Sequence, residues 1–210
     1  MSTRLFKPRV NTKEVYRRAL RTALFFAVFY MAGVVIGLVL PLTVPHWMQS
    51  DLSQAVQRAL AQNTRISETV SSAFANAALQ VGIIVLIWLL GQSPSGFPIV
   101  SLLLFLRAVS GGLAFSLVVS AVGWRGIGID LLALLPSNIL FAGGFIIAAT
   151  AATTMIQRLY RSELGSPRER VWVLYHSFFT VAVLAALLGG MLGVLVMPRT
   201  LGLFAVRAHG

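Results

Sequence analysis

The stretch from Phe74 to Ile156 is almost wholly apolar, and it constrains the fold more than any other feature of the chain. Within it stand Arg107, the carboxylate of Asp130 and the break Leu135-Pro136-Ser137-Asn138. Ionisable side chains are expensive at membrane depth, so each marks a packing contact or a functional site. The whole chain is 57% hydrophobic and 11% charged, whereas soluble domains carry about 25% charged residues. This composition indicates an integral membrane protein.

Five apolar runs approach the length of about 20 residues that a membrane-crossing helix needs. They cover residues 22–42, 74–90, 98–122, 138–156 and 171–197, the last closed by Pro198. The first run is too long for a signal peptide and lacks a cleavage site, so it is expected to be a retained anchor. The sequence therefore predicts one all-α membrane domain over residues 1–210, a polytopic bundle of five transmembrane helices behind a basic tail of residues 1–21.

The break at Pro136 predicts an irregular element before the fourth span. Proline removes a backbone donor and disfavours helix at the residue before it, and Ser137 or Asn138 can cap a new helix. Residues 127–135 are expected to form a short helix that either re-enters the membrane or lies flat on its outer surface. A backbone broken within lipid must be buried in protein or face water, which places Pro136 at a structural centre of the bundle.

The net charge of +11 is concentrated beside the spans, which argues against nucleic acid as a partner. Basic residues precede the first span and separate the fourth from the fifth, as the positive-inside rule requires for a cytoplasmic N-terminus. Their main role is then to set topology in the bilayer, with an added contact to lipid or a partner as the alternative. These residues are Arg4, Lys7, Arg9, Lys13, Arg17, Arg18, Arg21, Arg158, Arg161, Arg168 and Arg170.

This topology places residues 43–73 and the C-terminus outside the cell. The 43–73 segment has apolar residues at helical spacing and is too short to be an independent domain. It is either a connecting helix packed on the bundle or a docking surface for an extracytoplasmic partner. The residues expected to contact such a partner are His46, Trp47 and Arg58.

Polar side chains within the spans are expected to form a structural framework. Arg107 lies nine residues into its span, roughly 13 Å deep at 1.5 Å per residue. It either pairs with Asp130 or finds separate local partners. Asn76 and Gln80 lie one turn apart and are expected to face the bundle interior. The predicted framework consists of Asn76, Arg107, Asp130, Pro136 and Asn138.

Small residues recur at four-residue spacing in the spans and allow helix backbones to approach closely in lipid. The pattern does not distinguish packing within one chain from packing in a homo-oligomer. The groups are Gly33/Gly37, Ala108/Gly112, Gly144/Ala148/Ala152 and Gly189/Gly193.

No pattern in the sequence indicates catalysis, a metal site or a cofactor. Cysteine is absent, no phosphate-binding loop is present, and the three histidines, His46, His176 and His209, lack acidic residues at ligand spacing. His176 is the one candidate for a serine–histidine pair within the bundle and has no flanking motif. We therefore expect a protein that is not an enzyme. A permease-like subunit is the alternative, with Arg107 and the broken helix lining a path.

The order and spacing of several motifs resemble the stage II sporulation protein M family. They are Phe74-Ala75-Asn76-Ala77, the turn from Gly91 to Pro98, Leu104-Phe105-Leu106-Arg107, Gly111-Gly112, Phe115, Gly123-Trp124-Arg125-Gly126 and Leu134-Leu135-Pro136-Ser137-Asn138. The family often has lysine at the position of Arg107 and glutamine at that of Ser137. The first and fifth spans match in position and character.

The resemblance implies a five-span inner-membrane protein without catalytic activity. Such proteins act with peptidoglycan hydrolases, the stage II sporulation proteins D and P, during engulfment of the forespore. It thus implies a membrane scaffold that anchors or positions these hydrolases.

Overall fold

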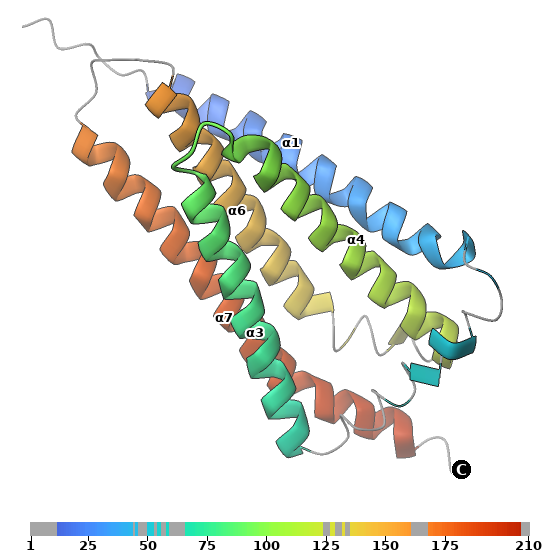
Figure 1. Ribbon diagram of the computed structural model, residues 1–210. Helices are drawn as coiled ribbons and strands as arrows, with labels where there is room; N and C mark the ends of the chain where they lie inside the picture. The colour runs from blue at the N-terminus through green and yellow to red at the C-terminus, as the bar shows by residue number, and fades with distance from the viewer. Residues whose placement is uncertain are drawn as a thin grey trace, which may run out of the picture.

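The computed structural model is a bundle of helices (Figure 1). It describes residues 12–43, 45, 50–52, 54–55, 58, 66–123, 127–128, 132, 135–160 and 168–206. Every regular element in these residues is helical, which confirms the all-α membrane bundle. The elements are α1 (Thr12–Val39), η1 (Leu40–Thr43), α3 (Ile66–Leu90), α4 (Gly96–Val122), α6 (Leu135–Tyr160) and α7 (Arg168–Val206).

Four of these helices contain a stretch long and apolar enough to cross a membrane: Arg17–Thr43, Gly96–Ala121, Leu135–Gln157 and Trp172–Val196. The apolar part of α3, Phe74–Leu90, is shorter. At 1.5 Å per residue it is about 25 Å long, against a hydrocarbon core of about 30 Å. α3 nevertheless lies along α7 and reaches both ends of the bundle (Figure 1).

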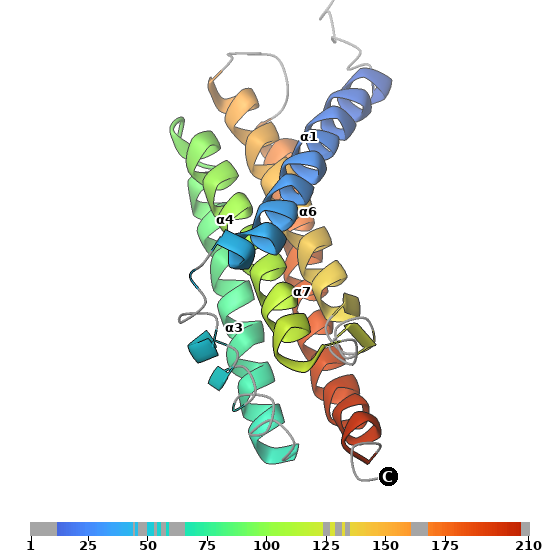
Figure 2. The same cartoon turned by 90° about the vertical axis from the view of Figure 1, so that its right-hand side faces the viewer.

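Successive helices alternate in direction along the chain, so the segments that connect them gather at the two ends of the bundle (Figures 1 and 2). The start of α1, the turn at residues 91–95, the end of α6 and the start of α7 lie at one end. This basic end carries Arg17, Arg18 and Arg21 on α1, and the sequence adds Arg158 on α6 and Arg168 on α7. η1, the start of α3 and the end of α7 lie at the opposite end.

Helix α6 is the centre of the bundle. Its apolar stretch is 56% buried, whereas those of α1, α4 and α7 are 17%, 22% and 28% buried. It packs against each of the four other long helices. Phe141, Phe145 and Met155 on α6 are fully or almost fully buried in the core. The outer faces of the other helices expose large apolar side chains, such as Val28 and Leu184, which suits a surrounding of lipid.

Two of the small-residue pairs expected from the sequence meet each other between α1 and α4. Gly33 lies against Phe105 and Ala108, and Gly37 lies against Val109. A Cβ atom added at Gly37 would overlap the Val109 carbonyl oxygen. The contacts advance along both helices in the same direction, so α1 and α4 run parallel and pack backbone to backbone within one chain.

The α6–α7 pair uses small residues in the same way. A Cβ atom at Gly144 would lie 3.0 Å from the Ala182 carbonyl oxygen, and one at Gly189 would lie 2.9 Å from the Phe141 ring. Here the contacts run in opposite directions along the two helices, so the pair is antiparallel. Both pairings leave little space for any residue larger than glycine.

The expected start of the fourth span is wrong by three residues, because α6 begins at Leu135 with Pro136 in its first turn. Proline fits there, since the first N–H groups of a helix need no partner within the helix. Neither Ser137 nor Asn138 is therefore the cap. The Ser137 hydroxyl is buried and has no hydrogen-bond partner among the described residues. Of the short helix expected over 127–135, residues 127 and 128 are helical, and Asp130 lies outside the described residues.

Pro198 does not end the last helix, contrary to expectation, because α7 continues to Val206. Pro198 lies beyond the apolar stretch, where water can bond to the carbonyl group that proline leaves without a donor. Residues 197–206, the α7 overhang, extend about 15 Å beyond the apolar stretch. Residues 66–73, the α3 overhang, extend about 12 Å before Phe74. Both overhangs lie at the end opposite the basic end (Figure 1).

Replacement of Gly112 by alanine should loosen the α1–α4 pair, because the new Cβ would overlap the Val34 carbonyl oxygen of α1. We expect a loss of about 1–3 kcal/mol in the free energy of unfolding. Gly111→Ala is the matched control, since its Cβ would meet its nearest atom, Arg107 Nη1, at 3.6 Å. Unfolding in mixed detergent–SDS micelles, followed by circular dichroism, measures both. Equal stability of the two variants would contradict this packing.

Candidate functional site: a polar network inside the bundle

Arg107 lies near the middle of α4. It comes eleven residues after the first residue of the helix, Gly96, or about 16 Å along the axis. This is two residues deeper than expected, because α4 begins at Gly96 and not at Pro98. The side chain is half-buried, so the guanidinium group must find partners within the bundle.

Hydrogen bonds link Arg107 to a row of neutral polar groups. Its Nε donates to Gln80 Oε1 on α3 at 3.0 Å, and its Nη1 donates to Ser110 Oγ at 3.3 Å. Gln80 Nε2 in turn donates to Asn76 Oδ1 at 2.8 Å. We call these four residues, Arg107, Ser110, Gln80 and Asn76, the Arg107 network. It connects the middle of α4 to the middle of α3.

The two remaining neighbouring helices supply aromatic surroundings. The ring centroid of Phe145 on α6 lies 6.0 Å from Arg107 Cζ, a geometry that contributes about 0.5–2 kcal/mol through cation–π attraction. The buried Tyr30 side chain on α1 lies near Arg107. The guanidinium group is thus surrounded by amide, hydroxyl and aromatic groups that come from four helices.

The structure gives Arg107 local hydrogen-bond partners, Gln80 and Ser110. In the part of the chain that it describes, Arg107 has no carboxylate partner. Asp130 lies outside that part, so pairing of Arg107 with Asp130 remains a prediction. Gln80, which the sequence placed on an inward-facing stripe, is indeed buried, with 2% of its surface exposed.

Asn76 was also expected to face the bundle interior, but its side chain is exposed. Two residues four apart differ by about 40° in direction around a helix and by about 6 Å along it. Asn76 therefore lies toward the end where α3 and α4 have diverged from their shared turn (Figure 1). Its Oδ1 still accepts the hydrogen bond from Gln80.

The residues around the proline break do not belong to the Arg107 network. Pro136 and Asn138 are half-buried at the start of α6. Ser137 lies against Gly189 and Gly193 of α7, so this turn contributes to the α6–α7 contact. The break and the arginine are two separate parts of the framework that the sequence predicted as one.

The expected partner-contact residues fall in a segment that is described only in part. His46 and Trp47 lie outside the described residues. Arg58 is helical and exposed. Their proposed role stays a prediction.

Sequence reasoning missed an aromatic cluster between α3 and α7 near the basic end. The His176 ring lies 5.7 Å from that of Trp172 and 5.8 Å from that of Trp88, between centroids. Tyr175 Oη donates a hydrogen bond of 2.6 Å to the Trp88 carbonyl oxygen. The sequence did contain a signal for this cluster, because aromatic residues within two turns of a span end are typical of the membrane interface.

The hydroxyl groups near His176 serve the helix itself. Ser177 and Thr180 donate to the carbonyl oxygens of Val173 and His176, at 2.8 and 2.9 Å. Among the described residues, no three His, Cys, Asp or Glu side chains lie close enough to share a metal ion.

Comparison with known proteins gives one finding. The family model of stage II sporulation protein M matches residues 23–198, a range that takes in all five apolar helices. It thus extends the resemblance to the first and fifth spans. No curated protein and no solved structure matches the chain.

Replacement of Arg107 by alanine should destabilise the bundle, because the buried Gln80 Oε1 loses its donor from Arg107. We expect a loss of about 1–3 kcal/mol, the usual cost of leaving a buried polar group unpaired. Arg107→Lys keeps the positive charge on a compact ammonium group that can still donate a hydrogen bond. We therefore expect it to lose less free energy of unfolding than Arg107→Ala. Ser101→Ala is a control, since that hydroxyl bonds to the Phe97 carbonyl oxygen of its own helix. Wild-type stability of Arg107→Ala under SDS unfolding would show that the network does not hold the bundle.

Proposed function

We propose, from the premise that this chain belongs to the stage II sporulation protein M family, that it is a membrane scaffold without catalytic activity. The family makes it a sporulation-related membrane protein. In our proposal it anchors or positions peptidoglycan-degrading partners during forespore engulfment in endospore formation. The observation that carries the proposal is the pair of helical overhangs on α3 and α7 at the end opposite the basic end.

The proposed setting is the bacterial cell (inner) membrane with the basic end in the cytoplasm. The charge difference between the two ends supports this orientation through the positive-inside rule. The N-terminus is then cytoplasmic, and both overhangs, η1 and the C-terminus face the compartment that contains peptidoglycan. An odd number of crossings requires α3 to span the membrane despite its shorter apolar part.

Labelling of single cysteines tests this orientation, because the natural chain has no cysteine. A maleimide that cannot cross the cell membrane is added to cells whose outer layers admit it and whose cell membrane is intact. We expect it to label Gln54→Cys. Ser93→Cys, in the turn between α3 and α4, should react only after the membrane is opened. The reverse pattern would place the basic end outside the cell. The overhangs would then face the cytoplasm, where they could not contact peptidoglycan hydrolases.

We propose a scaffold and not an enzyme because the polar side chains named below form hydrogen bonds within the protein itself. Arg107 and Gln80 bond to one another, and the hydroxyls of Thr150, Thr154 and Thr180 donate to carbonyl oxygens four residues back in their own helices. These groups hold helices together or complete them. The overhangs are too small to enclose a polymer, but they present helical surfaces beyond the membrane.

The proposed partners are peptidoglycan hydrolases resembling the stage II sporulation proteins D and P. The surface proposed for their contact consists of the overhangs and the segment around His46, Trp47 and Arg58. Arg58 is exposed, so it is available to an acidic group of a partner.

Co-purification of the full-length protein from its natural host is the direct test. We expect extracytoplasmic wall hydrolases to co-purify with the wild-type protein and to be reduced severalfold with Arg58→Glu. Gln54→Glu, at another exposed helical position in the same segment, should retain them. Absence of hydrolases from the purified wild type, with a nucleotide-binding subunit in their place, would contradict the scaffold and favour a permease.

A further inference from the structure

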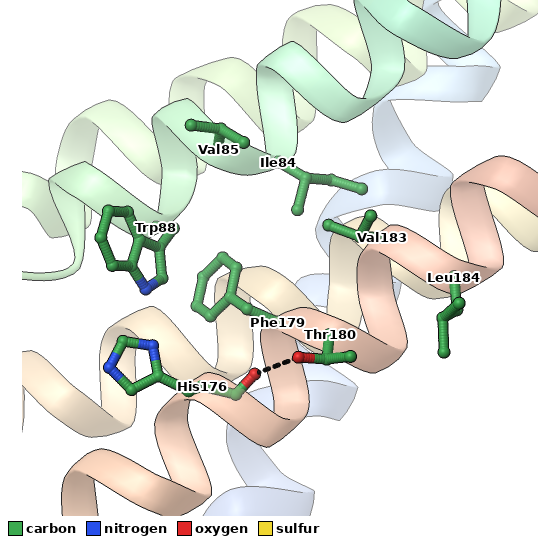
Figure 3. Close-up of a pocket in the computed structure, with 8 residues that line it drawn as sticks. All are labelled: Ile84, Val85, Trp88, His176, Phe179, Thr180, Val183 and Leu184. Atoms are coloured by element: carbon green, nitrogen blue, oxygen red, sulfur yellow. Dashed lines mark hydrogen bonds between the residues drawn. The ribbon is translucent and has the colours of Figure 1, made fainter.

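A groove of about 320 Å³ lies between α3 and α7 (Figure 3). Its lining changes in character along its length. Trp88 and His176 form one end, Phe179 follows, and the aliphatic side chains of Ile84, Val183 and Leu184 form the other end. The groove therefore offers polar-edged aromatic rings at one end and a purely apolar surface at the other.

The aromatic end of the groove points toward the basic end of the bundle. Trp88 comes three residues before Gly91, where the turn to α4 begins. His176 comes six residues after Arg170 and eight after Arg168, in the same helix, or about 9 and 12 Å along its axis. Tryptophan at this level is typical of the lipid headgroup region, and arginine beyond it attracts anionic headgroups.

The walls of the aromatic end are fixed by contacts within the bundle. The hydrogen bond from Tyr175 Oη to the Trp88 carbonyl oxygen joins α7 to α3. Gly91 lets the chain pass close to Tyr175 and Ala152, since a Cβ atom there would overlap both. A ligand would thus meet a site that already has its shape.

The dimensions favour a flexible chain over a helix. A helix with its side chains is about 10–12 Å across, which a groove of about 320 Å³ does not accommodate. The rim residues Val85 and Leu184 are 44% and 53% exposed, so the groove opens directly toward the bilayer. The bilayer itself consists of amphiphiles with long apolar chains, so a lipid is available to enter the groove.

We propose that the α3–α7 groove binds one phospholipid with an anionic headgroup. An acyl chain lies along Ile84, Val183 and Leu184, and the phosphate lies beside Trp88 and His176, toward the basic start of α7. The shape of the groove, the order of its lining residues and its position near the basic end of the bundle support this assignment. It does not depend on the scaffold function, because a permease with this groove would bind the same lipid.

Native mass spectrometry of the full-length protein tests the proposal. The purified protein is offered phosphatidylglycerol or phosphatidylcholine with identical acyl chains. We expect retention of one phosphatidylglycerol per chain, preferred over phosphatidylcholine by about fivefold or more, as one to two basic groups near a headgroup predict. Similar retention of both lipids would overturn the anionic preference.

Two matched pairs of variants locate the site. Thr180→Trp places an indole in the groove and should abolish the retained lipid, whereas Leu187→Trp, at an exposed position of α7 outside the groove, should not. His176→Glu should lower retention of phosphatidylglycerol more than Ser177→Glu. Equal retention by Thr180→Trp and Leu187→Trp would overturn the site. A wild-type dimer that Thr180→Trp dissociates would overturn it too, because a second copy would then fill the groove.

Discussion

The hydrogen bond from Arg107 Nε to Gln80 Oε1 joins α4 to α3 where the two helices otherwise pack only sparsely (Figure 1). Within a bilayer no water is present to satisfy either group, so both need partners from the protein. The bond ties α3 to α4 some distance from the turn at residues 91–95 that connects them. On its other side α3 packs against α7, where Tyr175 Oη donates a hydrogen bond to the Trp88 carbonyl oxygen. The Arg107–Gln80 bond therefore links α4 to the α3–α7 pair.

The second constraint is backbone contact through small residues. Helices in lipid gain little from burying apolar side chains, since lipid is equally apolar, and they associate through close packing. Gly37 and Gly112 bring α1 onto α4, and Gly144 and Gly189 bring α6 onto α7. α6 also packs against α1 and α4, and its Phe145 ring centroid lies 6.0 Å from Arg107 Cζ. The glycine contacts and the arginine contacts therefore support one arrangement of helices.

The sequence predicted the helical membrane bundle, the polar turn after α3 and the burial of Gln80, because these depend on composition and on local periodicity. It missed the continuation of α7 through Pro198, since the effect of a proline depends on whether the freed carbonyl group finds another partner. It also placed Asn76 inside, although the divergence of α3 from α4 exposes it. Tertiary contacts decide such cases. The aromatic groove needed α3 and α7 side by side, which no spacing within one helix reveals.

In our proposal, Arg107 holds helices together and does not line a transport path. A double-mutant cycle with Arg107→Leu and Gln80→Leu measures this most directly. If the two side chains serve each other, each single variant leaves a buried polar group unpaired, and the double variant restores stability. We predict a coupling free energy of about 1–2 kcal/mol in SDS unfolding of the full-length protein. Additive losses, with coupling near zero, would contradict the account.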